Sequence, residues 1–205
     1  MKFVMLVEGA TERGSLPAFF KRWLDPQLKQ KVRIKIVNMK GNQRFLSEFK
    51  AHVDQNLTQE SDAELIAVVG LLDLYRLDII PTSCKTVEEQ YTWGKNRLES
   101  QINDERFKMF FAVQEIEAWL FSDLQIFPEA VRKSLRPGAD RPEEIAVPSK
   151  LLGNTYRARL NKDYHKVIYG AGLFNRLDPQ RAIEKCPYFK QMLDWMLNAA
   201  QQKGA

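Results

Sequence analysis

The chain contains few residues with thiol or imidazole side chains, with only two cysteines and two histidines in 205 residues. Cys84 and Cys186 lie far apart, and neither has a cysteine or histidine nearby at zinc-ligand spacing. This excludes a disulfide framework and a structural zinc site. No Ser, His and Asp set and no Cys and His set stands out for nucleophilic catalysis. Any catalytic chemistry must therefore come from other groups.

The chain also lacks an apolar run long enough to span a membrane. The apolar beginning of the chain stops at Glu8, so we predict neither a signal peptide nor a membrane-spanning helix and expect a cytoplasmic protein. With 44% hydrophobic and 28% charged residues, the composition is that of an ordinary globular protein. The formal net charge of +5 modestly favours nucleic acid as a partner, because basic proteins release counterions from phosphates.

The loop after the first predicted strand has too few glycines for a phosphate-binding loop. Residues 3–6 are apolar, and Val7-Glu8-Gly9-Ala10-Thr11-Glu12 follows them. Dinucleotide and triphosphate loops need several glycines so that backbone amides can approach phosphate. Here one glycine follows Glu8, and a second acid, Glu12, comes four residues after the first. Hard oxygen ligands at this position suit Mg²⁺ or Mn²⁺.

Hydrophobic periodicity predicts an α/β domain with a mostly parallel sheet flanked by helices. We expect residues 1–124 to form this domain, and residues 125–205 to form a helical C-terminal extension packed on the same body, because prolines interrupt its short helical pieces. Residues 136–144 are the best candidate for a mobile loop. The predicted strands lie at 3–6, 32–37, 65–72 and 107–113, and the predicted helices of the α/β domain at 16–24, 45–57 and 86–102.

Acidic residues follow three of these strands. Glu8 follows the first, Asp73 the third, and Glu115 and Glu117 the fourth. The carboxyl ends of parallel strands line one edge of a sheet, so these carboxylates should converge there and could hold one or two divalent ions. A single acid could simply mark a strand that ends at the surface, but three together favour a site. We favour Glu117 as a ligand, with Glu115 second.

These segments also resemble a known family. Residues 7–12, Asp73-Leu74-Tyr75 and residues 115–123 are similar to the TOPRIM fold, the catalytic domain of topoisomerases, bacterial primases and overcoming-lysogenization-defect (OLD) nucleases. More narrowly, they resemble the TOPRIM-like family called domain of unknown function 4276, and the likeness continues at residues 148–150 and 186–189. The resemblance implies a TOPRIM or Rossmann-like sheet and a nuclease that depends on Mg²⁺ or Mn²⁺.

The resemblance also implies roles for individual residues. The TOPRIM glutamate falls on Glu8, and the second acid of the OLD-type motif falls on Glu12. Glu8, Asp73 and Glu117 are then the catalytic acids. All five acids, with Glu12 and Glu115 assisting, are the expected metal ligands.

The chain departs from the pattern of its relatives at two positions. The TOPRIM Asp-x-Asp pair falls on Asp73 and Tyr75, so the second acid is missing, and Gln114 stands where the narrower family usually has histidine. Tyrosine is a poor Mg²⁺ ligand. These two positions support a second hypothesis, a non-catalytic TOPRIM-like subunit that binds nucleic acid or an ATPase and regulates it.

A nuclease also needs positive charge near the scissile phosphate. Lys150 and Lys166 lie in family-like surroundings, and each could stabilise the developing negative charge. The alternative for either lysine is a solvated surface charge. Arg76 is close enough to Asp73 in sequence to touch substrate, but a pairing with Glu8 or Asp73 explains it equally well.

Our leading hypothesis is a Mg²⁺- or Mn²⁺-dependent endonuclease that hydrolyses phosphodiesters, with DNA favoured over RNA as the nucleic acid. Relatives of this kind are often encoded with an ATPase in phage-defence pairs, so the resemblance implies a separate ATPase subunit. A homodimer is also compatible with the sequence. Nucleotidyl transfer, as in primases, is disfavoured because no template-binding or zinc module is evident.

Overall fold

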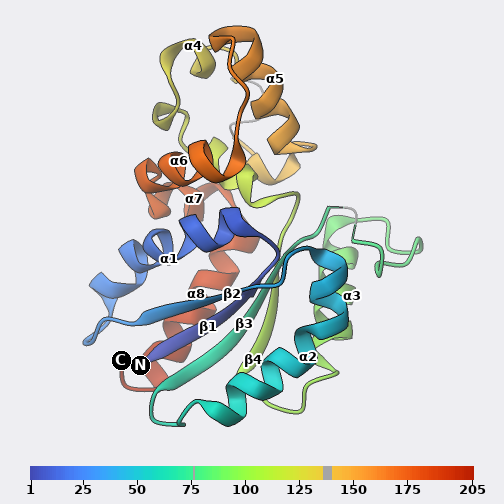
Figure 1. Cartoon of the computed structure of the whole chain (residues 1–205), viewed down its shortest axis with the longest axis vertical. Coiled ribbons are helices and arrows are strands. Elements are labelled where there is room, and N and C mark those ends of the chain that lie inside the picture. The colour runs from blue at the N-terminus through green and yellow to red at the C-terminus, as the bar shows by residue number, and fades with distance from the viewer. Residues whose placement is uncertain (76, 136–139) are drawn as a thin grey trace.

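The computed structural model describes residues 1–75, 77–135 and 140–205 and has a single parallel sheet at its centre (Figure 1). Its four strands lie in the order β2-β1-β3-β4, and each neighbouring pair is parallel. The predicted α/β fold with a mostly parallel sheet is confirmed. The strands are β1 (Lys2–Val7), β2 (Arg33–Asn38), β3 (Leu65–Asp73) and β4 (Phe107–Ala112).

Helices flank the sheet and form most of the C-terminal part. The α-helices are α1 (Ala10–Leu24), α2 (Asn42–Gln59), α3 (Val87–Glu99), α4 (Glu129–Arg132), α5 (Pro148–Leu160), α6 (Ala171–Arg176), α7 (Pro179–Lys185) and α8 (Pro187–Gln202). The short 3₁₀ turns are η1 (Asp25–Gln27), η2 (Ile116–Ser122), η3 (Leu124–Ile126) and η4 (Pro142–Glu144), and η5 (Lys166–Gly170) is one turn of π-helix. None of the helices in the described part of the chain is both long and apolar enough to cross a membrane.

Strands β1, β3 and β4 are mostly buried, whereas the edge strand β2 is partly exposed. Successive side chains of a strand point to opposite faces of the sheet. In β1, Met5 packs into a core with α1 and α8, whereas Val4 packs into a second core with α2 and α3. Strand β3 is buried along residues 65–72, as its continuous apolar run predicts. Figure 1 shows one layer of helices on each side of the sheet, with α1 and α8 on one face and α2 and α3 on the other.

Helix α3 also protects the free edge of β4. The helix begins at a capping box in which Thr86 and Glu89 bond reciprocally to each other's backbone N–H. Further along, Lys95 Nζ donates to the Met109 carbonyl at 2.9 Å, and Glu99 Oε1 accepts from the Met109 N–H at 2.8 Å. Side chains thus satisfy main-chain groups that an edge strand would otherwise expose.

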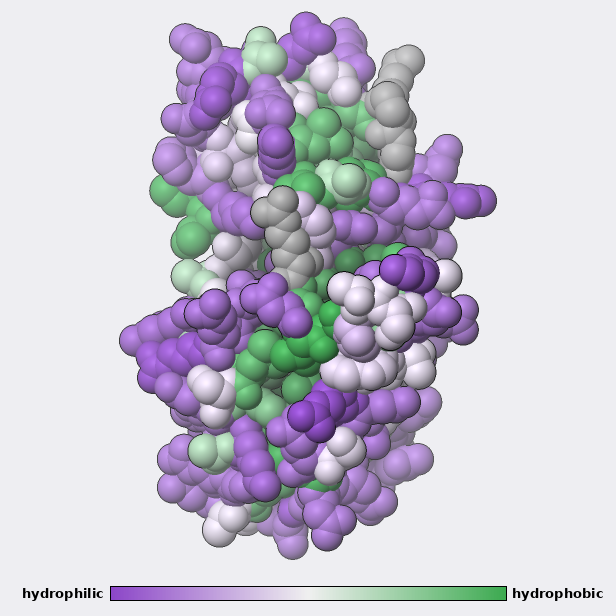
Figure 2. Space-filling view, turned by 90° about the vertical axis from the view of Figure 1, so that its right-hand side faces the viewer, coloured by the Kyte–Doolittle hydropathy of each residue, from purple (hydrophilic) through white to green (hydrophobic). Residues whose placement is uncertain are grey.

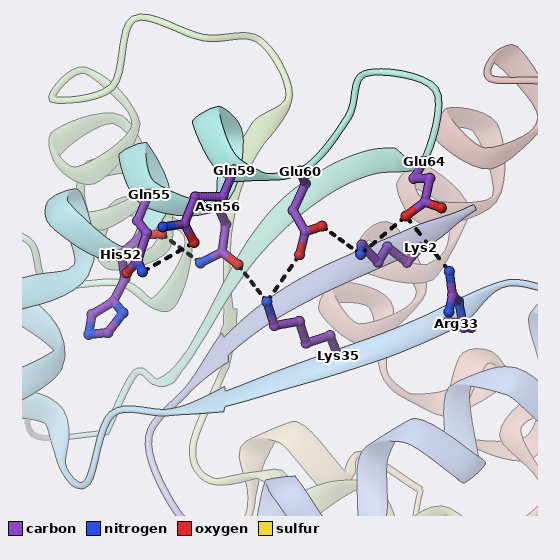
Figure 3. Close-up of polar contacts among 9 residues, drawn as sticks. All are labelled: Lys2, Arg33, Lys35, His52, Gln55, Asn56, Gln59, Glu60 and Glu64. Atoms are coloured by element: carbon purple, nitrogen blue, oxygen red, sulfur yellow. Dashed lines mark hydrogen bonds and ion pairs between the residues drawn. The ribbon is translucent and has the colours of Figure 1, made fainter.

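A chain of polar contacts ties the amino ends of β1 and β2 to the end of α2 (Figure 3). Lys2 Nζ lies 2.6 Å from Glu60 and 3.5 Å from Glu64. Lys35 Nζ lies 3.1 Å from both Glu60 and Asn56. Exposed ion pairs of this kind contribute little each. They lie at the opposite end of the strands from the predicted acidic site.

The C-terminal part shares a core with the sheet. An aromatic cluster joins Phe19 and Phe20 of α1 to Trp119, Phe174 and Phe189, with 4.4 Å between the ring centroids of Trp119 and Phe189. The last helix, α8, packs on the sheet and on α1 through a buried face that includes Phe189, Met192 and Met196. The boundary at residue 124 stays a prediction. Of the expected loop 136–144, residues 136–139 lie outside the described residues, as does Arg76, and residues 142–144 form η4.

Gly70, in the middle of β3, is expected to be intolerant of a side chain. A Cβ at this position would lie 2.5 Å from the buried Met109 Sδ and 3.2 Å from Phe45 Cζ. Gly70→Ala should lower the free energy of unfolding by about 1–3 kcal/mol because the core is overpacked. Gly153→Ala, in α5 with no atom within 4 Å of the added carbon, should instead raise it by about 0.5–1 kcal/mol. Urea denaturation measures both, and equal effects would contradict the packing argument.

Candidate functional site

Five carboxylates gather at the carboxyl ends of β1, β3 and β4. Glu8 directly follows β1, Glu12 lies in the first turn of α1, and Asp73 is the last residue of β3. Glu115 and Glu117 follow β4. Because these three strands are neighbours and parallel, their carboxyl ends lie side by side. Burial raises the pKa of Glu8, Glu12, Asp73 and Glu117, and the charges of neighbouring acids raise each of them further, as expected of carboxylates that lie close together.

The single glycine of the first loop makes room for a carboxylate. Gly9 is the N-cap of α1, and a Cβ on it would lie only 3.1 Å from Glu12 Oε2. The Glu12 side chain therefore folds back over the glycine toward the end of β1. Burial raises the pKa of Glu12 to about 7, and the charges of Glu117 and Glu8 contribute in the same direction.

Asp73 connects the end of β3 to the turn after β4. Its Oδ1 accepts a hydrogen bond from the Ile116 N–H at 3.1 Å. Burial raises the pKa of Asp73 well above its usual range, and the nearby charges of Glu117, Glu12 and Glu8 raise it further. The carboxylate is held in place by this bond, and the charge of Lys166 offsets part of the rise in its pKa.

Glu115 and Glu117 both face the ammonium group of Lys166, although the two acids do not lie in one regular helix or strand. A helix beginning at Glu115 would turn the two side chains about 200° apart. Glu115 is instead extended, with φ −139° and ψ 159°, and the 3₁₀ turn η2 begins at the next residue. Lys166 Nζ lies 3.4 Å from Glu115 Oε1 and 3.4 Å from Glu117 Oε1. This change of backbone conformation brings both acids to one point.

Ser149 fixes the orientation of Glu115. Its N–H donates to Glu115 Oε2 at 2.7 Å, and its hydroxyl donates to Oε1 at 2.8 Å. Our sequence argument gave this serine no role. The available signal was its place in Pro148-Ser149-Lys150, one of the segments that carry the family resemblance.

Of the two predicted lysines, the structure brings only Lys166 to the acids. Burial alone would lower the pKa of Lys166, but the charges of Glu117, Glu115 and Asp73 outweigh burial and raise it. The ammonium group is thus firmly protonated. Lys150 is exposed and, within the described part of the chain, forms no ion pair with these carboxylates, so its role stays a prediction.

Two buried polar atoms at the site lack hydrogen-bond partners among the described residues. Glu117 is 1% exposed, and its Oε1 accepts no hydrogen bond of normal geometry, with Lys166 as its ion-pair partner.

The Tyr164 hydroxyl is the second of these atoms, and it would lie 3.4 Å from a Cβ placed on Gly170. Burial raises the pKa of Tyr164, and so does the charge of Glu117. Sequence reasoning missed Tyr164. Unsatisfied groups of this kind are unusual in protein interiors, and a bound ion or water is one explanation for them.

The donor set is chemically suited to Mg²⁺ or Mn²⁺ because it consists of carboxylate oxygens. Crowded carboxylates with raised pKa values gain stability from an added cation. Among the described residues, however, no three Asp, Glu, His or Cys side chains are already arranged around a metal position. Side-chain rotation would have to accompany binding, with Lys166 as the group that now neutralises Glu115 and Glu117.

The two departures from the family pattern lie next to each other. The Tyr75 N–H donates to the Gln114 carbonyl at 3.3 Å, and the neighbouring Leu74 N–H donates to the Ala112 carbonyl at 2.8 Å. Tyr75 and Gln114 therefore occupy the same corner, where the chain leaves β3 and β4.

The fold is similar to that of solved OLD protein regions. The C-terminal region of the Burkholderia pseudomallei OLD protein matches with a TM-score of 0.51 and 18% identity, over 97% of this chain and 98% of that chain. The C-terminal region of the Xanthomonas campestris pv. campestris OLD protein matches with a TM-score of 0.49 and 17% identity, over 98% and 94% of the two chains. At such identities the similarity concerns the fold alone, and the match to the Burkholderia pseudomallei region supports the predicted α/β fold.

Comparison with curated protein sequences gives no significant match. The family model described as Domain of unknown function (DUF4276), in contrast, matches residues 7–197, which is nearly the whole chain. The chain therefore belongs to this family.

Proposed function

We propose that this protein is a divalent-metal-dependent nuclease of the TOPRIM type, which hydrolyses phosphodiester bonds in DNA or RNA, with DNA favoured. The observation that carries the proposal is the convergence of five buried or half-buried carboxylates around Lys166. The OLD-like fold is consistent with it. As part of the same proposal, the protein is the effector of a phage-defence pair with a separate ATPase.

In this proposal, Glu8, Asp73 and Glu117 hold Mg²⁺ or Mn²⁺, with Glu12 and Glu115 assisting. The bound ion would supply activation of the attacking water and stabilisation of charge on the phosphate. Ser149 keeps Glu115 oriented through its two hydrogen bonds.

Lys166 has a different role in each state of the site. Without a cation it neutralises Glu115 and Glu117. With Mg²⁺ or Mn²⁺ held by the acids, the ammonium group of Lys166 would be free to bind a non-bridging oxygen of the scissile phosphate. Lys166 thereby serves as a counter-ion first and as a catalytic cation afterwards.

A second candidate function is a non-catalytic subunit that binds nucleic acid or an ATPase and regulates it. Tyr75 and Gln114 favour it, since both stand where relatives have a potential ligand or proton carrier. Figure 2 also shows separate patches of apolar side chains in the middle of one face, with hydrophilic side chains around them. Apolar surface bordered in this way is typical of protein contacts.

Nuclease assays with acid variants separate the two candidates. In Mg²⁺ or Mn²⁺, the wild type should cut supercoiled plasmid, single-stranded DNA or RNA, and Glu8→Ala and Asp73→Ala should lower the rate by about 10³-fold or more because the ion is lost. Glu144→Ala, which removes an exposed acid paired with Arg141, is the matched control and should cut normally. Cutting that survives both site variants would refute the proposal. Absence of cutting, together with nucleic-acid binding that EDTA leaves unchanged, would support the second candidate.

The two roles of Lys166 can be measured separately. Lys166→Met should bind Mn²⁺ roughly 10-fold more tightly than the wild type in calorimetric titration, because the competing ammonium group is gone. The same variant should cut nucleic acid far more slowly. Lys150→Met is the matched control, and its Mn²⁺ affinity should equal that of the wild type. Equal Mn²⁺ affinities for wild type and Lys166→Met would contradict the counter-ion role.

The pKa of Glu12 predicts how stability depends on pH. A folded-state pKa of about 7, above the ordinary value of 4.5, means that the folded protein keeps a proton that the unfolded chain has lost. Without metal, the free energy of unfolding should therefore fall as pH rises from about 4.5 to 7. Glu12→Gln removes this contribution and should be more stable than the wild type at pH 8, by at most about 3 kcal/mol. Denaturant melts at pH 5 and pH 8 in chelator measure it.

Glu143 provides the control for the metal-binding part of this argument. It belongs to η4 and is 8% exposed, and burial raises its pKa to about 7 as well. Its carboxylate lies away from the acidic site and accepts from the N–H groups of Tyr188 and Phe189 at the start of α8. Glu143→Gln should reduce the pH dependence in the same way but leave stabilisation by Mg²⁺ intact. Glu12→Gln should weaken both. Equal stabilisation of the two variants by Mg²⁺ would mean that Glu12 is not a ligand.

A further inference from the structure

Two consecutive apolar side chains on η5 are unusually exposed. Ile168 is 71% exposed and Val167 is 52% exposed. In the described part of the chain, the one other large apolar residue classed as exposed is Val87, at 37%. Isolated exposed apolar residues are common, but adjacent ones on an irregular turn need an explanation.

This turn lies directly over the acidic site. Lys166, the residue before Val167, reaches Glu115 and Glu117. At the other end of the turn, a Cβ on Gly170 would meet Thr11 Cγ2, in the first turn of α1, at 3.4 Å. The element η5 is therefore anchored at both ends beside the carboxylates, with Val167 and Ile168 exposed between the anchors.

Two lysines, Lys162 and Lys166, come shortly before the exposed apolar pair in the chain, and Lys166 offsets part of the negative charge of the acids beneath the turn. Lys162 and His165 are exposed in the same segment, and the ring of His165 stacks on that of Tyr169 with 6.3 Å between centroids. The nearby acid Asp163 is already paired with Arg157 at 2.7 Å. Phosphates attract positive charge, and bases pack against exposed side chains, so lysines beside exposed apolar groups suit nucleic acid.

The size of the patch argues against a protein partner as its main occupant. A stable protein interface uses about 20–30 residues on each side. Two side chains are enough, however, for an apolar wedge, since proteins that kink nucleic acid insert one or two such side chains between neighbouring bases.

We propose that Val167 and Ile168 form a wedge that enters between adjacent bases of nucleic acid held over the acidic site. Bound nucleic acid is then locally unstacked at the position where Lys166 and the carboxylates meet the backbone. The inference rests on the proposed function for its ligand, and it adds a substrate class: strands that unstack easily, such as flexible pyrimidine–purine steps, frayed ends and single strands.

Base unstacking can be measured without cleavage. A DNA duplex that carries 2-aminopurine, a base analogue that fluoresces more strongly when unstacked, is titrated with protein in Ca²⁺ or EDTA. The wild type should raise the fluorescence several-fold. The double variant Val167→Ser with Ile168→Ser should lose most of this rise and bind the duplex roughly 5–10-fold more weakly. Val87→Ser removes an exposed apolar side chain elsewhere and should behave as the wild type.

The outcomes distinguish this inference from the nuclease proposal. A wild type that unstacks the duplex, but cuts nothing when Mg²⁺ is added, supports the wedge and counts against the nuclease. A wild type that cuts, while the double variant gives an unchanged fluorescence rise, refutes the wedge alone. Failure of the wild type to bind the duplex also refutes it. A double variant with normal unstacking and an altered oligomeric state would assign the patch to protein contacts instead. Thermal melting confirms that the variants are folded.

Discussion

Like charge confined at one end of the sheet is the constraint on which the rest of the structure depends. The ladder hydrogen bonds of β1, β3 and β4 fix where Glu8, Asp73 and the Glu115 segment begin, so their carboxylates cannot move apart by shifting the backbone. Burial makes this repulsion costly, as the raised pKa values of the acids indicate. A strained cluster is tolerated because both faces of the sheet are densely packed, and the stability of those cores offsets the cost at the edge.

The helical extension completes the site that the sheet begins. The strands supply acids, whereas the groups that neutralise and orient them, Lys166 and Ser149, both come from beyond residue 124. Without the extension, Glu115 would lose its two serine bonds and its cation together. The aromatic cluster of Trp119, Phe174 and Phe189 holds the extension in position. Residues 125–205 thus contribute side chains directly to the acidic site.

The sequence predicted the features that depend on local periodicity. The apolar run at 65–72 identified a buried strand, and parallel order then placed the acids at one edge. Ser149 and Lys166 could not be assigned in the same way, because they lie 34 and 51 residues from Glu115 and no periodic pattern encodes such contacts. The exposure of Val167 and Ile168 escaped for a related reason, since an apolar pair in a short segment reads as core until its neighbours are known.

Tyr75 and Gln114 are neighbours, so the two replacements change the charge of the same part of the site. An aspartate at the position of Tyr75 would bring a further negative charge to the corner beside Gln114, and a histidine at the position of Gln114 could balance it. Tyrosine and glutamine are neutral, so no charge has to be balanced where the chain leaves β3 and β4. The charged acids Glu115 and Glu117 are paired with Lys166 instead. In the proposed function, the five acids would supply oxygen donors for one divalent ion, while a second ion near Tyr75 would lack a carboxylate. The two replacements are therefore compatible with a working site built around a single ion.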